Sequence, residues 1–378
     1  MTMAGAQRAR LAPIRVGAVR DAARLAWAEG GEFSVPESLA DRLRPFRGAD
    51  GRVAIGAECL VAEAADADAV RRHSAFTDRK PASSRLPFSY RRVPEWLRDL
   101  AAGAAGRLGR RRLARIEFPR WPLDLSADFV ADLRANAARA GAPTPVMLTH
   151  DIDTPEGLRH AVELFAGLEE AVGARSAHYV VPCDWPVDDG LVRELRDRGH
   201  EIGVHGYDHS NWTPFAADGE RRARIAAAKP FIERHAVSGY RAPSLLRTQA
   251  LIEDLRGSYR YDSSIPTSGG LFPVPGNGCA SARPFLIEGL LEIPVSMPRD
   301  GSLLFLGRSP EQILSAWREA AARIRASGGM INLLTHCETR FSGNEKMLGI
   351  YRRFLEDIAQ SRDFAFALPR DIASRRAA

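Results

Sequence analysis

The sequence predicts an α/β protein in which a parallel β-sheet closes as a barrel. From residue 145 onward, short apolar segments alternate with amphipathic helical segments over about eight units. This alternation is typical of βαβ units, whose strands run parallel. The second observation is that ionisable residues directly follow several of these strands, and barrels carry their chemistry at the carboxyl ends of their strands.

The elements of this barrel are expected in a regular order. We expect strands at 146–149, 177–181, 201–204, 239–241, 259–261, 291–295, 330–334 and 364–368. We expect helices between them at 156–172, 188–198, 219–235, 248–255, 310–326 and 344–360.

The first third of the chain lacks this alternation. Here the apolar spacing predicts a helix over 16–28, helical turns over 37–43 and short strands at 52–55 and 59–61. A polar segment at 71–94 favours a linker or an extended arm, and a helix is expected from Ser126 towards Ala140. Residues 1–140 are therefore predicted to form an N-terminal α+β extension, and residues 141–378 the barrel.

Composition indicates an ordinary globular protein with a basic N-terminal third. The 378 residues are 45% hydrophobic and 26% charged. Residues 1–140 hold 25 of the 53 Lys and Arg but only 17 of the 47 Asp and Glu. The basic cluster at 107–115 is either a solvated helix face or a docking surface for phosphate or anionic lipid head groups. It lacks interleaved aromatic residues, so no nucleic-acid partner is expected.

Cysteine usage and hydropathy favour a cytoplasmic protein. Cys59, Cys183, Cys279 and Cys337 form no CxxC pair, which excludes a thiolate zinc site and a dense disulfide framework. No uninterrupted apolar run follows the basic N-terminus, so a secretory signal is not expected. No window approaches the ~18 consecutive apolar residues of a membrane span.

Ionisable residues gather where the predicted strands end. They are Asp151 and Asp153 after the first strand, His205 and His209 after the third, Arg241 after the fourth, Asp262 after the fifth and His336 after the seventh. Parallel strands place these ends at one edge of the barrel, so a site built from several strands is expected there.

These residue types permit metal-assisted hydrolysis. If the turn after the third strand is helical, His205 and His209 share one face and can bind one ion. Two imidazoles and one carboxylate, from Asp151 or Asp153, are a ligand set for Zn²⁺ or Fe²⁺ that leaves positions open. The other Asp is then free to act as a base on metal-bound water.

Three further residues have expected roles around that ion. A guanidinium at Arg241 would hold the catalytic Asp ionised. His336 would be the general acid, with a core histidine as the alternative interpretation, and Asp262 would support its imidazolium form. We expect His150, His160, His178, His200 and His235 to be structural or surface residues.

Taken together, five segments resemble the NodB-homology polysaccharide deacetylases, carbohydrate esterase family four. They are Thr149-His150-Asp151-Ile152-Asp153, His205-Gly206-Tyr207-Asp208-His209, Arg241-Ala242-Pro243, Tyr261-Asp262-Ser263-Ser264 and Leu333-Leu334-Thr335-His336. The resemblance covers about residues 143–370 and leaves the N-terminal third unexplained.

The resemblance implies a distorted (β/α)7-type barrel and assigns the residue roles. Asp151 matches the catalytic base, and Asp153, His205 and His209 match the metal ligands. Arg241 matches the residue that braces the base, His336 the general acid and Asp262 a supporting carboxylate.

Two departures from the common family pattern stand out. The first motif has Asp-x-Asp rather than adjacent aspartates, but strand alternation still points both side chains the same way. The family's Trp after the fourth motif is missing, with Ile265 and Pro266 in its place.

The expected function is metal-dependent removal of an N-acetyl group from an amino sugar. Zn²⁺ is the expected ion, with Co²⁺, Mn²⁺, Ni²⁺ and Fe²⁺ as alternatives. A cytoplasmic enzyme would meet a nucleotide-linked, lipid-linked or small glycoside intermediate of surface-glycan or glycoconjugate biosynthesis. The basic N-terminal region would suit a phosphorylated substrate or a membrane surface. A deformylase of a lipid-linked formamido sugar and a non-catalytic sugar-binding barrel are the alternatives.

Overall fold

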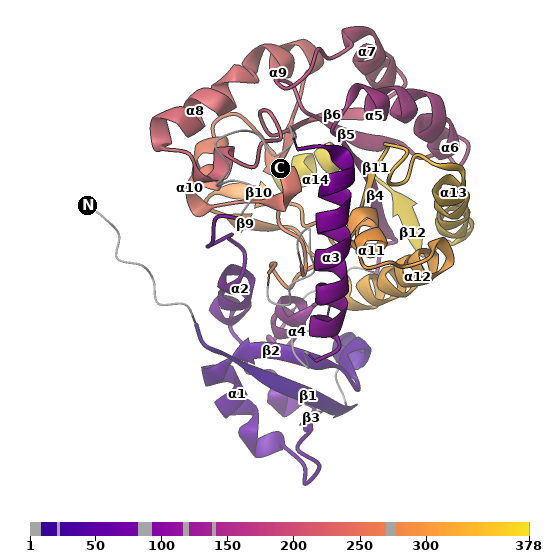
Figure 1. The fold of residues 1–378 in the computed structure, drawn as a ribbon. Coiled ribbons are helices and arrows are strands. Elements are labelled where there is room, and N and C mark those ends of the chain that lie inside the picture. Colours follow the sequence, from indigo (N-terminus) through magenta and orange to yellow (C-terminus); the bar gives the residue numbers. More distant parts are fainter. Residues whose placement is uncertain are drawn as a thin grey trace.

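A nine-stranded sheet forms the centre of the described part of the protein (Figure 1). The computed structural model describes residues 9–20, 23–81, 93–115, 121–137, 141–269 and 277–377. The sheet has the strand order β11 (Ile331–His336), β4 (Thr144–Ile152), β5 (Ser176–Val180), β6 (Glu201–His205), β7 (Gly239–Arg241), β8 (Tyr261–Asp262), β10 (Leu290–Glu292) and β9 (Phe285–Ile287), and β12 (Phe364–Phe366) also pairs with β4. All neighbours pair in parallel except β9 and β10, which form an antiparallel edge.

The chain after β10 completes the barrel. Val295 N donates to Ile265 O at 3.0 Å, and Met297 N donates to Asn332 O of β11 at 3.2 Å. This segment therefore bridges the gap between the β8–β10 side of the sheet and β11. The predicted fold class, a distorted (β/α) barrel with an N-terminal α+β extension, is confirmed.

Helices follow most of the strands, and several of them begin at side-chain caps. They are α5 (Pro155–His160), which continues through a π-helical turn (Ala161–Phe165) into α6 (Ala166–Glu170), α7 (Asp189–Asp197), α8 (Asp218–Ala227), α9 (Lys229–His235), α10 (Gln249–Leu255), α11 (Asp300–Phe305), α12 (Pro310–Ser327), α13 (Glu345–Gln360) and α14 (Pro369–Ala377). Thr154, Asp188, Thr248 and Asn344 each accept a backbone N–H at the start of their helix, which satisfies donors that the helix itself leaves unpaired.

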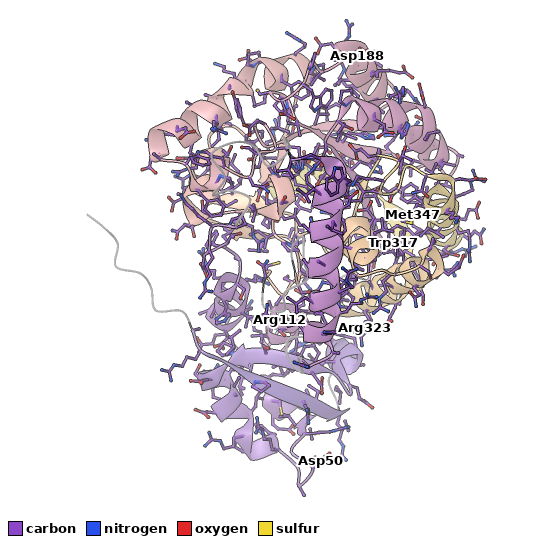
Figure 2. All side chains as sticks on the ribbon, in the orientation of Figure 1. Asp50, Arg112, Asp188, Trp317, Arg323 and Met347 are labelled. Atoms are coloured by element: carbon purple, nitrogen blue, oxygen red, sulfur yellow. The ribbon has the colours of Figure 1, made fainter. Side chains whose placement is uncertain are left out.

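Helix α12 shows how local sequence signals define a helix and its buried face. It begins with a capping box between Ser309 and Gln312 and ends at Gly328 in the left-handed conformation. Its buried residues recur every three or four positions, and they include Trp317 (labelled in Figure 2), which packs edge-on against Phe354 of α13 at 5.7 Å between ring centroids.

The N-terminal third forms a small α+β unit. Strands β1 (Leu11–Val19), β2 (Glu32–Pro36) and β3 (Val53–Ile55) form a three-stranded sheet. Its helices are α1 (Glu37–Leu43), α2 (Ala64–His73), α3 (Glu95–Leu113) and α4 (Ser126–Asp132), with a 3-10 helix at Ala23–Ala28.

Several local predictions in this third were wrong. The helix expected over 16–28 is the end of β1 followed by a 3-10 turn, because Ile14 and Val16 are buried at alternate positions of a strand. The strand expected at 59–61 is not formed, because its first residue is the last of a 3-10 turn at Ala57–Cys59. The expected arm at 71–94 begins inside α2, and its residues 82–92 lie outside the described residues.

Buried polar contacts join the two parts of the chain. Asp128 of α4 accepts a hydrogen bond from Ser281 Oγ at 2.5 Å and another from Ala282 N at 2.8 Å. Arg283 forms an ion pair with Asp132 at 2.8 Å. Contacts thus continue across position 140, and the boundary between residues 1–140 and 141–378 stays a prediction. In the part of the chain that is described, no helix is both long and apolar enough to cross a bilayer.

Candidate metal centre

The strand register brings the predicted site residues to one edge of the sheet. His336 of β11 lies opposite Asp151 of β4, and His205 of β6 lies opposite Arg241 of β7. Because the strands are parallel, these residues lie at the same carboxyl ends. The register therefore places these four residues at one edge of the sheet.

Asp153, His205 and His209 form a compact donor set. His209 Nε2 lies 3.3 Å from Asp153 Oδ1, and His205 Nε2 lies 3.5 Å from the same oxygen. One possible ligand atom from each residue lies within 4.8 Å of the other two. Two imidazoles and one carboxylate at this spacing can hold one divalent ion.

The loop after β6 places the two histidines in an unexpected way. The helical turn that we expected is absent, since residues 207–211 form bends. Gly206 and His209 both have left-handed backbone conformations, with φ of 69° and 53°. Such a conformation is uncommon for a residue with a side chain, and it turns the His209 ring to 5.1 Å from that of His205.

The tautomer of His205 fits a metal ligand. Its Nδ1 lies 3.0 Å from the carbonyl oxygen of Arg241, which only accepts, so Nδ1 carries the proton and Nε2 keeps its lone pair. Burial is the main cause that lowers the pKa of His205, to about 4, although Asp151 and Asp153 oppose it. The ring is thus neutral near pH 7, as a ligand requires.

Asp151 is a buried carboxylate held by Arg241. Arg241 Nη1 donates to Asp151 Oδ1 at 3.0 Å, and the other carboxylate oxygen lies 3.5 Å from His205 Nε2. Burial alone raises the pKa of Asp151, but His205, Arg241 and His336 together outweigh it and hold the pKa below its usual value. Asp151 is therefore ionised near neutral pH.

Arg241 is itself fixed on every side. Its Nε donates to Ser263 O and its Nη2 to Ser263 Oγ, both at 2.9 Å, and Nη1 also donates to Thr149 Oγ1 at 3.0 Å. Its guanidinium stacks 4.1 Å from the ring centre of Tyr179. That ring covers Gly203, where a Cβ would lie 2.4 Å from it, so only glycine fits on β6 at this position.

His336 is paired with a residue that the sequence did not suggest. His336 Nδ1 donates to Asp300 Oδ1 at 2.9 Å, and His336 N donates to Asp300 Oδ2 at 2.8 Å. Burial opposes the charged ring, but Asp300, with smaller contributions from Asp153 and Asp151, raises the pKa of His336 to about 9. His336 is therefore protonated near pH 7.

Asp262 does not support His336, in contrast to the expectation from sequence. It forms a hydrogen bond with the buried Glu292 on the neighbouring strand, and burial raises the pKa of both carboxyls. Its Oδ1 also accepts from Ser264 Oγ at 2.6 Å, and Ser264 Oγ accepts from Ala242 N at 2.8 Å. Asp262 thus fixes the chain that follows Arg241.

Sequence reasoning missed three ionisable residues around the site. Asp300 lies five residues beyond the sixth expected strand, an end to which no group was assigned from the sequence. Glu338 Oε1 accepts from Asp153 N at 3.2 Å and from Thr154 Oγ1 at 2.9 Å. Arg299 is buried, donates from Nε to Ser302 Oγ at 2.9 Å, and interacts electrostatically with Asp151 and Asp300.

The other histidines of β4–β6 belong to a separate buried network. Glu169, His178 and His200 also lie at a spacing that could hold an ion. However, Ser176 Oγ occupies the middle, at 2.5 Å from Glu169, 3.0 Å from His178 and 2.9 Å from His200. His150 Nε2 bonds Glu169 at 2.7 Å, so hydrogen bonds hold this cluster together as a structural element, although His178 Nδ1 has no hydrogen-bond partner among the described residues.

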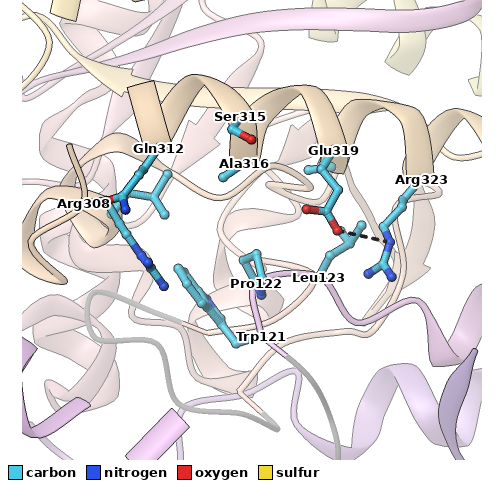
Figure 3. Close-up of a pocket in the computed structure, with 11 residues that line it drawn as sticks. Trp121, Pro122, Leu123, Arg308, Gln312, Ser315, Ala316, Glu319 and Arg323 are labelled. Carbon is cyan, nitrogen blue, oxygen red and sulfur yellow. Dashed lines mark ion pairs between the residues drawn. The ribbon is translucent and has the colours of Figure 1, made fainter. Parts of the chain in front are cut away.

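A surface pocket lies away from this centre. It has a volume of about 300 Å³ and lies between residues 121–123 and helices α11 and α12 (Figure 3). Trp121, Arg308, Gln312 and Arg323 are among its lining residues, and none of the metal-centre residues lines it.

Comparison with known proteins identifies the fold. No model of a protein family matches the sequence, and no curated protein matches it. A protein from Mycobacterium smegmatis described as a polysaccharide deacetylase matches with a TM-score of 0.50 and 21% identity, over 64% of this chain and 95% of that one. A protein from Pseudomonas aeruginosa PAO1, also described as a polysaccharide deacetylase, matches with a TM-score of 0.48 and 15% identity, over 61% of this chain and 89% of that one. A family 4 carbohydrate esterase from Streptomyces lividans matches with a TM-score of 0.36 and 15% identity, over 59% of this chain and 90% of that one. The strand order, the shared edge of the sheet and the first of these matches together show that this chain has the fold of the NodB-homology polysaccharide deacetylases.

Proposed function

We propose that the protein is a metal-dependent hydrolase that removes an N-acetyl group from an amino-sugar substrate. The observation that carries the proposal is that an ionised carboxylate and a protonated imidazole lie beside one set of possible metal ligands. Asp151 is ionised and held by Arg241, and His336 is protonated and held by Asp300. A base and an acid on either side of a site is the arrangement that amide hydrolysis needs.

Asp153, His205 and His209 would hold the ion. Their donor set fits Zn²⁺, which we expect, and Co²⁺, Mn²⁺, Ni²⁺ and Fe²⁺ are alternatives. When bound, the ion would act as a Lewis acid towards water and the acyl oxygen. The chain supplies this set in ready form, because His205 is neutral and oriented through its bond to the Arg241 carbonyl.

The chain's own residues would then move the protons. Asp151 accepts a proton from the attacking water, and Arg241 keeps the carboxylate ionised and in place until it does so. His336 donates its Nε2 proton to the leaving nitrogen, while Asp300 stabilises the imidazolium before the transfer. The amide is thereby cleaved to a carboxylate and an amine, with water as the second reactant.

An exposed aromatic side chain beside the site suits a sugar. Trp212 follows the ligand loop at 206–211 and is 38% exposed. An indole presents a flat apolar face with one polar N–H, which can contact a sugar ring. We assign it to the substrate groove, in place of the tryptophan that the fourth motif lacks.

We place the reaction in the cytoplasm. All four cysteines are free thiols, and Cys59, Cys279 and Cys337 are buried. Unpaired cysteines are typical of reducing compartments. Nucleotide-linked, lipid-linked or small glycoside N-acylamino sugars are then the candidate substrates.

A product-release assay tests the proposal. The purified protein, loaded with Zn²⁺, is offered nucleotide-linked and lipid-linked N-acetylamino sugars and their N-formyl counterparts. Release of acetate supports the proposed function. Release of formate alone assigns the deformylase alternative, and release of neither favours a non-catalytic sugar-binding barrel.

Two variants separate metal binding from proton transfer. Asp151→Asn should bind metal with unchanged stoichiometry and lose activity by about 10²–10⁴. His205→Ala should lose both metal and activity. Asp197→Asn, an exposed carboxylate on α7 with a side chain 67% exposed, is the control and should retain both. Full activity of Asp151→Asn would refute the role given to Asp151.

A further inference from the structure

Helix α3 carries a concentration of exposed apolar side chains. Six large apolar residues are markedly exposed in the described part of the chain, and four of them lie on α3. They are Trp96 (68%), Leu97 (41%), Leu100 (61%) and Leu108 (67%). A protein that keeps this much apolar surface together usually uses it for binding.

The orientation of α3 is the reverse of an ordinary surface helix. Its inner face is made of small residues: a Cβ on Gly106 would lie 1.9 Å from Phe305 O of α11, and Ala102 is buried. At 100° per residue, Leu97, Leu100 and Leu108 lie about 120–180° around the helix from Gly106, and Trp96 lies about 80° from it. An amphipathic helix normally buries its large apolar residues, but α3 points them to solvent.

The carboxyl end of the same helix is strongly basic. Arg107, Arg110, Arg111 and Arg112 lie in its last two turns, and Arg115 follows it (Arg112 is labelled in Figure 2). A Cβ on Gly307 would lie 3.1 Å from Arg110 Nη1, so this end lies against the turn before α12, where Arg308 lines the pocket of Figure 3. The basic surface thus continues from α3 onto the barrel.

Helix α3 is also connected to the catalytic acid. Figure 1 shows it lying in front of the barrel beside α11, whose first residue, Asp300, holds His336. Asp99 of α3 forms an ion pair with Arg340, and the neighbouring Phe341 ring lies 4.6 Å from the ring of His336. Whatever α3 contacts is therefore brought close to the site.

We propose that the solvent-facing side of α3 docks on an anionic lipid bilayer. Exposed Trp and Leu side chains would enter the interface between head groups and acyl chains, and the arginines would bind the phosphates. The charge of the helix end complements an anionic surface, which favours a bilayer over a neutral protein partner. If the proposed function holds, the substrate is then a lipid-linked N-acylamino sugar presented at that surface.

Vesicle co-sedimentation tests the docking without using activity. The full chain should sediment with vesicles of phosphatidylcholine and phosphatidylglycerol but not with phosphatidylcholine alone, and binding should fall as salt approaches ~1 M. Arg110→Glu/Arg111→Glu/Arg112→Glu should lower partitioning on the order of a hundredfold. Leu108→Asp should lower it about tenfold.

Matched controls keep the test specific. Leu286→Asp alters a side chain that is also 67% exposed, but on β9, and should leave binding unchanged. Arg193→Glu/Arg222→Glu/Arg234→Glu reverses three exposed arginines on α7, α8 and α9 and should lower binding only a few-fold, through net charge. Equal losses in α3 and control variants would overturn the proposal. So would self-association that depends on α3 without vesicle binding, which would assign the face to a second copy.

The substrate clause has its own measurement. The same N-acylamino sugar is offered on a lipid in these vesicles and as a soluble glycoside. Leu108→Asp should lower kcat/KM about tenfold for the first and leave the second unchanged. Equal effects on both would refute the lipid-linked substrate. Activity on neither, with α3-dependent vesicle binding intact, would instead refute the proposed function and leave the docking standing.

Discussion

Replacing Asp300 by Asn should move the alkaline limit of activity. Asp300 is fully buried and accepts from His336 Nδ1 at 2.9 Å, from His336 N at 2.8 Å and from Ser342 Oγ at 2.7 Å. The substitution removes the negative charge and leaves a side chain of nearly the same shape. Burial, which lowers the pKa of His336, is then opposed only by the weaker charges of Asp153 and Asp151.

The size of this effect follows from the pKa of His336. The pKa is about 9 with Asp300 in place, against an ordinary value of 6.5. If it returns to 6.5, the change of about 2.5 units corresponds to about 3 kcal/mol. At pH 7.5 the protonated fraction would fall from about 97% to about 9%, so kcat should fall about tenfold.

The assay is the pH dependence of kcat with excess Zn²⁺. A general acid must be protonated, so activity is lost as pH rises through the pKa, and the Asp300→Asn limb should lie about two units lower. A bound ion would lower the pKa of His336 in both proteins because it would repel the imidazolium, so the difference between the two proteins is the tested quantity. Ser342→Ala removes one hydrogen bond to Asp300 but keeps its charge, and its limb should stay within a few tenths of a unit. Thermal unfolding should first show that the Asp300→Asn protein is folded. If that protein kept the alkaline limb of the wild-type pH profile, His336 would not be the general acid.

Three further changes probe the base, the groove and the core. Arg241→Lys cannot reproduce the bonds of the guanidinium to Asp151, and kcat should fall on the order of a hundredfold with metal content unchanged; unchanged kcat would contradict the bracing role. Trp212→Ala should raise KM several-fold and leave kcat within about twofold in steady-state assays, whereas a loss confined to kcat would remove it from the groove. Phe354→Ala opens a cavity beside Trp317 and should lower the urea unfolding free energy by about 3–5 kcal/mol; a cost below 1 kcal/mol would contradict the packing.

The barrel was predictable because its signals are local. Each strand is a short apolar run, and several of the following helices carry their own cap and their own amphipathic period, as Ser309 and Trp317 show for α12. The strand ends were predictable for the same reason, since Asp151, His205 and His336 directly terminate apolar runs. Because the strands are parallel, their carboxyl ends then meet at one edge of the sheet.

The parts that failed depend on contacts distant in sequence. Asp300 meets His336 across 36 residues, and nothing local to either residue signals the pairing. Asp262 stands at a strand end, which is why the sequence suggests it as the partner of His336. In the structure its carboxyl group is instead hydrogen-bonded to Glu292 on β10. In the N-terminal third, the local sequence around Val16 is compatible with either a helix or a strand. The pairing of β1 with β2 and β3 determines that this segment is a strand.

The two aspartates of β4 illustrate how one motif can divide into two proposed roles. Asp151 and Asp153 point to the same side of the strand, so alternation alone cannot distinguish them. Their partners can. Arg241 already neutralises Asp151, and a cation placed on that carboxylate would face the guanidinium 3.0 Å from Oδ1. Asp153 Oδ1 lies 3.5 Å from His205 Nε2 and 3.3 Å from His209 Nε2, whereas of these two histidines only His205 is paired with Asp151, at 3.5 Å, so both imidazole donors gather at Asp153. A divalent ion is therefore favoured at Asp153, and Asp151 keeps an oxygen available to accept a proton.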